Sequence, residues 1–168
     1  MINYLATQKN WQNAFSDTIT SFAELAQALD LPIDSFDSQV GQFPLKVPRR
    51  FVQKMGKGDI HDPLLKQVLP TFLETVQVTG FVTDPLDEQH ANPVKGIIHK
   101  YASRVLIPVT GACVVNCRYC FRQHFDYHEN LPTQNDWQAI SAYITAHPAV
   151  NEVILSGGDP LSLSNRRL

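Results

Sequence analysis

The sequence predicts an α/β protein in which an N-terminal helical region precedes a strand, a helix and a second strand. Apolar residues recur at helical spacing early in the chain, whereas two short β-branched runs, 105–110 and 152–156, flank a helical pattern near its end. Strand, helix and strand in this order form a βαβ unit with parallel strands. We therefore expect two domains, residues 1–100 and residues 101–168.

Composition and charge exclude several classes of protein. The 168 residues are 43% hydrophobic and 18% charged, as in soluble globular proteins, and the formal net charge is −2. Nucleic acid is therefore not an expected partner, because surfaces that bind it are strongly basic. The N-terminus has no basic segment before an apolar core, and no apolar run reaches the roughly 18 residues that span a bilayer. We expect a cytoplasmic protein with no membrane partner.

Two helices are expected before residue 100. Residues 21–24 form a capping-box pattern, and apolar residues recur at helical spacing over 22–29. A second helix is expected where Asp62 can cap a helix that has Pro63 at its first position. Its apolar face would consist of Leu64, Leu65, Val68 and Leu69.

The last third of the chain supplies the βαβ unit. The first strand, 105–110, is of the type buried on both faces, although Pro108 is typical of a sheet edge or a barrel rim. Thr133 can cap the helix that follows. One face of that helix is lined by Trp137, Ile140, Ser141 and Ile144. The second strand, 152–156, is again of the buried type.

All the cysteines of the chain lie in one short loop directly after the first of these strands. They are Cys113, Cys117 and Cys120, in CxxxCxxC spacing. An odd number of clustered cysteines is a poor disulfide framework but is typical of a metal or redox site. Three thiolates are one fewer than a closed four-cysteine site requires, so the spacing indicates an open coordination position.

Three interpretations of this loop are open from the residues alone. The cysteines could be ordinary buried thiols, although Asn116 and Arg118 between them make poor apolar surroundings. Together with His124 they could bind zinc in a metal-binding or interaction module that has no redox chemistry. They could also hold three irons of an iron–sulfur cluster, which leaves the fourth iron for another ligand.

A glycine-rich turn follows the second strand. Gly157 and Gly158 let the backbone approach a ligand closely, and Asp159 can receive an ammonium group. An ordinary turn between a strand and a helix would use the same residues. Because parallel strands end at the same edge of a sheet, we expect this turn beside the cysteine loop, which favours a shared binding site.

With these motifs, the sequence resembles radical S-adenosylmethionine (SAM) enzymes and, among them, lysine 2,3-aminomutases. The resemblance rests on the cysteine spacing, on the Gly-Gly-Asp turn, and on the surrounding runs 99–106, 117–125 and 155–161. Earlier runs resemble the branch that converts α-lysine to β-lysine for attachment to elongation factor P. These runs are 47–51, 55–59, 62–69 and 83–90.

The resemblance implies an isomerase with three cofactors, built on a partial (β/α)6 barrel. The cluster, 4Fe-4S, would be held by Cys113, Cys117 and Cys120. SAM, cleaved at the open iron to a radical that takes a hydrogen from lysine, would be bound by Tyr119, Gly157, Gly158 and Asp159. Pyridoxal 5′-phosphate (PLP) would carry the migrating nitrogen.

Further residues and partners follow from the same resemblance. Tyr101 and Arg104 match positions near the PLP phosphate, where Lys100 could add charge. Arg122 matches the position that receives the carboxylate of the substrate, lysine. The implied partners are lysine and an electron donor such as flavodoxin or ferredoxin, with a functional link to elongation factor P modification.

The chain departs from this family in its length. From Val105 to Leu168 there are 64 residues, which allows two barrel strands at roughly 30 residues per βαβ unit. The seven lysines all precede the cysteines, so none matches the PLP-linking lysine of the family. We therefore expect a truncated barrel that is inactive by itself and that aggregates through uncovered apolar faces.

Overall fold

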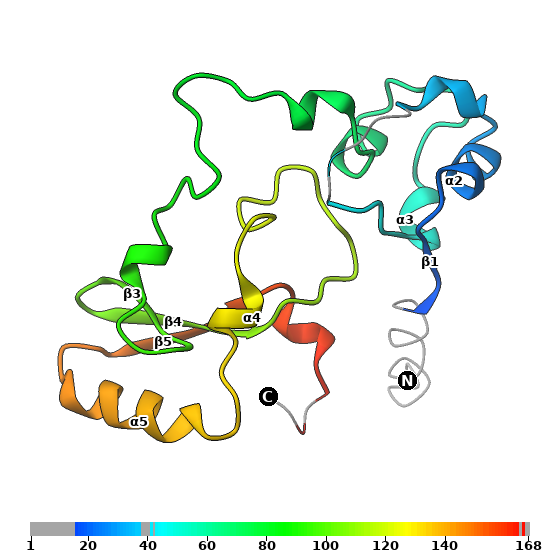
Figure 1. The fold of residues 1–168 in the computed structure, drawn as a ribbon. Coiled ribbons are helices and arrows are strands. Elements are labelled where there is room, and N and C mark those ends of the chain that lie inside the picture. Colours follow the sequence, from blue (N-terminus) through cyan, green and yellow to red (C-terminus); the bar gives the residue numbers. More distant parts are fainter. Residues whose placement is uncertain (1–15, 38–40, 42, 165, 167–168) are drawn as a thin grey trace. The chain divides into compact units, whose positions relative to one another are not determined.

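The computed structural model describes residues 16–37, 41, 43–164 and 166 (Figure 1). It divides the chain into two compact units, of which the first comprises 1–80 and 114–120 and the second comprises 81–113 and 121–168. Each unit is considered by itself below. The domain boundary expected between residues 100 and 101 stays a prediction.

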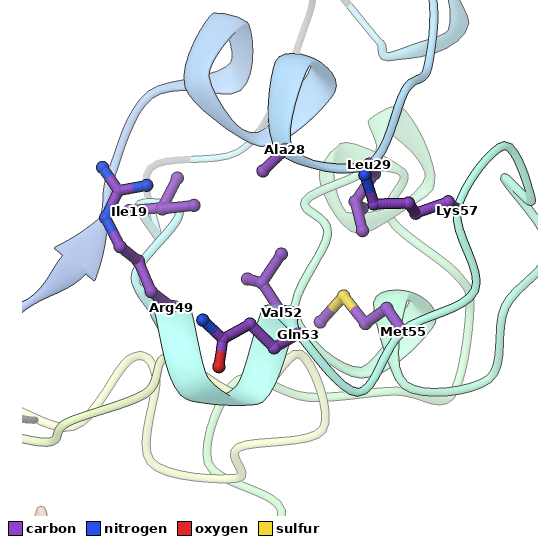
Figure 2. A pocket seen from close by; sticks show the side chains of 8 residues that line it. All are labelled: Ile19, Ala28, Leu29, Arg49, Val52, Gln53, Met55 and Lys57. Atoms are coloured by element: carbon purple, nitrogen blue, oxygen red, sulfur yellow. The ribbon is translucent and has the colours of Figure 1, made fainter.

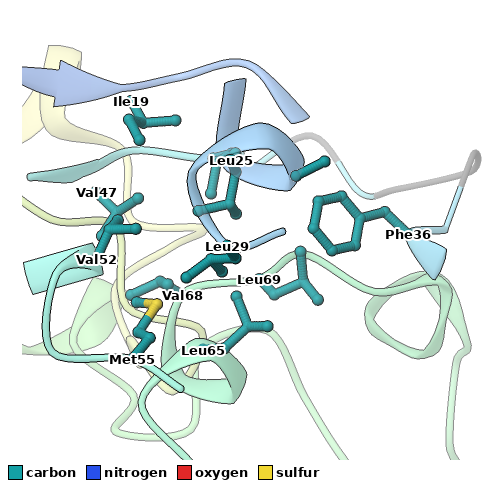
Figure 3. Packing of buried hydrophobic residues seen from close by; sticks show 12 residues of the cluster. Ile19, Leu25, Leu29, Phe36, Val47, Val52, Met55, Leu65, Val68 and Leu69 are labelled. Atoms are coloured by element: carbon teal, nitrogen blue, oxygen red, sulfur yellow. The ribbon is translucent and has the colours of Figure 1, made fainter. Parts of the chain in front are cut away.

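Short elements and loops build the first unit. Its elements are β1 (Thr18–Ile19), α2 (Phe22–Ala28), a 3-10 turn (Ile33–Ser35), β2 (Val47–Pro48), α3 (Arg49–Val52) and two further 3-10 turns (Leu65–Gln67 and Phe72–Thr75). The two strands pair antiparallel. Apolar side chains from these elements and from the loops between them form one buried core (Figure 3). This unit is therefore held by packing rather than by extensive secondary structure.

One of the two expected N-terminal helices is confirmed, and the other is much shorter than expected. The first is α2, which buries Leu25 as the apolar spacing predicts. In place of the second there is only the 3-10 turn Leu65–Gln67. Asp62 accepts hydrogen bonds from the N–H groups of Leu64 at 2.8 Å and Leu65 at 2.9 Å, but Leu64 and not Asp62 occupies the N-cap position of this turn. The helix cannot extend far because Pro70 follows closely.

The second unit is built on a three-stranded sheet with the order β3, β4, β5. Its elements are a 3-10 turn (Gln89–Ala91), β3 (Ile98–Tyr101), β4 (Arg104–Thr110), α4 (Tyr127–Asn130), α5 (Asp136–Ala146), β5 (Glu152–Gly157) and a last 3-10 turn (Pro160–Ser162). Strand β4 pairs antiparallel with β3 and parallel with β5. The expected βαβ unit is thus confirmed, whereas β3 was not expected from the sequence.

Helix α5 covers one face of this sheet. Its Ile140 packs against Ile97, Val105 and Ile107, and all four side chains are buried. Pro108 lies within β4 opposite Ser156, and the register shifts immediately after it. A proline has no N–H to donate to the ladder, so an irregularity at this point is expected.

Strand β5 keeps an exposed apolar surface, unlike the strand buried on both faces that the sequence predicted. Its Val153, Ile154 and Leu155 are 45%, 36% and 41% exposed. The reason is that β4 is its one strand partner among the described residues. The α/β class is therefore confirmed, but the described residues form small sheets and no closed barrel, so the barrel is not confirmed. None of the described helices has the length and apolar character needed to cross a membrane.

Candidate functional site

The cysteine loop is tied to the first unit through the residues between its cysteines. The backbone N–H of Asn116 donates to the carbonyl of Lys46 at 2.9 Å, and its side-chain amide donates to the carbonyl of Pro44 at 3.0 Å. The N–H of Arg118 donates to the carbonyl of Gln67 at 2.7 Å. Segments far apart in the sequence therefore fix the path of this loop.

The three thiols are partly buried, and none of them forms a disulfide. The N–H of Cys120 donates to the carbonyl of Cys117 at 3.1 Å, which closes a tight turn between these two cysteines. Burial raises the pKa of the Cys117 thiol, and the neighbouring Cys120 thiol raises it further. Cys113 belongs to the second unit. A metal that binds here would have to displace the thiol protons.

The donor chemistry fits an iron–sulfur cluster, because such clusters are held by cysteine thiolates. Across the described ranges, no three His, Cys, Asp or Glu side chains are gathered so that they could hold a metal ion. His124, the fourth ligand of the zinc interpretation, is exposed.

The glycine-rich turn lies beside the segment that leads into the cysteine loop, as expected. Within the second unit, the N–H of Gly158 donates to the carbonyl of Thr110 at 2.6 Å, and the N–H of Asp159 donates to that of Ala112 at 2.8 Å. A β-carbon on Gly157 or Gly158 would lie 2.3 Å from one of these two carbonyl oxygens. Gly157 also has a φ of +110°. The close approach of the two backbones thus requires glycine even without a ligand.

The carboxylate of Asp159 has a structural task as well. It accepts a hydrogen bond from the N–H of Leu161 at 3.0 Å and so caps the turn Pro160–Ser162. Tyr119, the residue expected near the adenosyl group, lies in the first unit and is 71% exposed. Its hydroxyl contacts the side-chain oxygen of Gln67 at 3.4 Å. The adenine base of an adenosyl group could stack on a ring that is as exposed as that of Tyr119.

The residues expected at the PLP phosphate and the substrate carboxylate line one cavity in the second unit. This cavity has a volume of about 250 Å³. Its polar lining consists of Glu88, Lys100, Tyr101, Arg104 and Arg122, and apolar side chains such as Phe121 complete it. Arg104 is about half exposed and forms an ion pair with Glu152 at 3.1 Å. The cavity therefore combines a largely apolar lining with three cationic side chains, of which Arg104 and Arg122 are paired with carboxylates.

Arg122 is buried in this cavity and bound by a carboxylate of the protein itself. Its Nε and Nη2 donate to the two carboxylate oxygens of Glu88 at 2.8 Å and 2.7 Å, and its Nη1 donates to Ser156 Oγ at 2.9 Å. The guanidinium also lies over the rings of Phe121 and Phe125. Both side chains of the ion pair are 6% exposed. Glu88 was not predicted as a site residue from the sequence. Its only sequence signal was that it lies in the run 83–90, one of the runs that resemble the aminomutases.

A second cavity, of about 350 Å³, lies within the first unit (Figure 2). Apolar side chains such as Val52 and Met55 line it together with Arg49 and Lys57. Arg49 forms ion pairs with Asp17 and Glu24, and Lys57 forms one with Asp30. None of the residues that the sequence predicted for a site lines this cavity, and its cations are neutralised within the unit.

Comparison with known proteins gives several related sequences. The chain is 45% identical over 164 residues to the L-lysine 2,3-aminomutase of Haemophilus influenzae and 43% identical over 166 residues to that of Escherichia coli. Each alignment covers 96% of this chain and 48% of the relative. For the L-lysine 2,3-aminomutase of Clostridium subterminale the identity is 30% over 168 residues, which is 97% of this chain and 40% of the relative. The chain thus spans about half the length of these curated relatives. No family model matches it.

Proposed function

We propose, on the premise that this chain is a homologue of the L-lysine 2,3-aminomutases, that it provides one half of an isomerase converting L-α-lysine to β-lysine. The observation that carries the proposal is the cavity shared by Tyr101, Arg104 and Arg122. The resemblance matched these residues to the PLP phosphate and to the lysine carboxylate. Because PLP acts on the amino group of its substrate, both anionic groups have to fit one cavity.

The side chains of this cavity have distinct roles in the proposal. Lys100, Tyr101 and Arg104 bind the phosphate of PLP. Arg122 binds the lysine carboxylate, and because it is buried, that contact is stronger than it would be in water. Glu88 and the two phenylalanine rings hold the guanidinium plane in place and exclude water from it.

The radical chemistry belongs to the cofactors. The proposed ligands of the 4Fe-4S cluster are Cys113, Cys117 and Cys120, and those of SAM are Tyr119, Gly157, Gly158 and Asp159. Once bound, the cluster and SAM supply a radical that abstracts hydrogen, and PLP stabilises the migrating amino group. The protein contributes thiolates, a close backbone approach at the glycines, and cations for the anionic groups.

The remaining parts of the proposal concern architecture and partners. Further strands would pair with β5 to form a partial (β/α)6 barrel, and the exposed apolar side chains of β5 support this. An electron donor such as flavodoxin or ferredoxin would reduce the cluster in the cytoplasm. The product, β-lysine, would serve the modification of elongation factor P.

Anaerobic reconstitution with iron and sulfide tests the proposal. We expect a brown chain with about four irons and four sulfides, the composition of the cluster. A Cys117→Ser variant, which removes one proposed ligand, should hold much less of both. Stoichiometric zinc without sulfide would instead support the Cys3His interpretation with His124. With lysine, SAM, PLP and a reductant, β-lysine should form only when the other half of the enzyme is present, and turnover by this chain alone would contradict that expectation.

A further inference from the structure

We infer that Glu74 is a positioning residue for the metal cluster and that it acts through Arg118, in a contact called here the Glu74–Arg118 clamp. This inference rests on the proposed function, because it assigns a task to residues around the cluster-binding loop. Every contact in the argument lies within the first unit. No motif in the sequence points to Glu74, which lies 44 residues before its partner.

The clamp is a partly buried, charge-assisted contact. Nε of Arg118 donates to Oε1 of Glu74 at 2.8 Å, and Nη2 of Arg118 contacts Oε2 of the same carboxylate. The side chains are 8% and 19% exposed. Nη2 also donates to the carbonyl of Phe43 at 3.1 Å, and the guanidinium lies 4.9 Å from the centre of the Phe43 ring. A lysine could not make this two-point contact, because it has no planar fork of donors.

The carboxylate of Glu74 is itself held in place. Its Oε1 accepts a hydrogen bond from the N–H of Thr71 at 3.2 Å, in a capping box on the turn Phe72–Thr75. Glutamine can take the same capping position, but it brings no charge to Arg118. The two tasks of Glu74 can therefore be separated by mutation. This separation makes the inference testable.

Arg118 transmits the position of Glu74 to the proposed ligands because it directly follows Cys117 and comes two residues before Cys120. Its backbone N–H is bound to Gln67, so both its main chain and its side chain are fixed to the first unit. A loop ordered in advance binds its metal more tightly, because the entropy of ordering is lost before binding. Because Arg118 directly follows Cys117, the clamp would also place opposite charges beside a cluster bound there, where charge sets the reduction potential.

The test uses the full chain, reconstituted anaerobically as wild type and as Glu74→Gln, Arg118→Met and the double variant. We expect each single variant to lose its cluster to a chelator about tenfold faster than wild type, a change that corresponds to about 1.4 kcal/mol, because the loop is then held less firmly. The double variant should lose it no faster than either single variant, because both remove one contact.

The reduction potential separates positioning from mere folding. Glu74→Gln removes a negative charge near the cluster and should raise the potential, whereas Arg118→Met removes a positive charge and should lower it. Thr71→Ala weakens the cap without touching the clamp, and Lys57→Met breaks an exposed ion pair in the same unit. Both controls should keep the wild-type potential and cluster lifetime.

Several outcomes would overturn the inference. Wild-type cluster lifetime and potential in both single variants would do so, as would shifts of the same sign. If Glu74→Gln unfolds, as judged by circular dichroism, Arg118→Lys decides, because it keeps the charge and loses the two-point contact; a wild-type lifetime there contradicts the clamp. A wild-type chain that takes up no iron and sulfide would overturn the proposed function as well, and this is seen before any variant is compared.

Discussion

The two units bury their apolar residues by different means. Among the described residues, the first unit has a core of twelve buried side chains, although its helices and strands are short. The second unit has the longest helix and the three-stranded sheet, yet its sheet cluster contains four buried side chains, and β5 stays exposed. Burial therefore follows from what covers an element rather than from how regular that element is. A sheet needs both faces and both edges covered, whereas loops can wrap a core from several sides.

Each unit also contains one buried arginine bound to a glutamate. In the first unit Glu74 holds Arg118, within the cysteine loop, and in the second unit Glu88 holds Arg122, within the proposed substrate cavity. The two pairs have similar geometry but different surroundings. One fixes a loop to a core, and the other lines a cavity of about 250 Å³.

The largest expected effect comes from Glu88→Ala in the second unit. It leaves Arg122 buried without a carboxylate, which typically costs about 3–5 kcal/mol. Glu152→Ala is the matched control, because it breaks a half-exposed ion pair with Arg104 that is worth at most about 1 kcal/mol. Urea unfolding followed by circular dichroism measures both. If both variants lost the same free energy of unfolding, burial of the Glu88–Arg122 pair would not be the reason for the large effect.

Leucine truncation compares the two units directly. Leu65→Ala removes a fully buried side chain from the first core and should cost about 3 kcal/mol. Leu155→Ala removes the same atoms from β5, where the side chain is 41% exposed, and should cost about 1 kcal/mol. Hydrogen exchange of each unit gives the two free energies of opening. A loss at Leu155 as large as that at Leu65 would mean that β5 is covered in solution.

The exposed surface of β5 should govern association more than stability. Val153→Thr keeps the β-branched shape of a strand residue that is 45% exposed, so we expect a change within about 0.5 kcal/mol in the free energy of unfolding. Aggregation measured by light scattering should decrease, because the substitution removes apolar surface from the exposed strand. Val105→Thr in buried β4 is the control and should destabilise the unit. Unchanged aggregation in Val153→Thr would contradict a role of β5 in association.

The smallest expected effect is a loss of stability of the first unit at acidic pH. The N–H groups of Gly56 and Leu65 hold the pKa of Asp62 below its ordinary value of 3.8, despite the opposing effect of burial. Its contribution to stability is therefore complete above that value and is lost as the pH falls through the lower pKa of the folded state. Asp62→Asn should flatten this acid loss in a series of melting curves. An unchanged slope would rule out Asp62 as its source.

The elements that sequence reasoning found are those with strong local signals. The periodicity that predicted α2, and the strand and helix patterns that predicted β4, α5 and β5, need no knowledge of distant residues. Strand β3 was missed because its partner residues are recognised only when the hairpin forms. The helix expected after Asp62 is only a turn because Pro70 is near, although Asp62 does accept a hydrogen bond from the N–H of Leu65.

The sequence by itself determined the chemistry available to this protein. The spacing of its cysteines and its Gly-Gly-Asp turn restrict that chemistry before any fold is known. The tertiary structure alone decided which charges are paired, because a partner 34 or 44 residues away comes into contact only when the chain folds. This pairing strongly affects stability, since a buried guanidinium is stable only beside an opposite charge. Arg118 and Arg122, alike in the sequence, thereby acquire different roles.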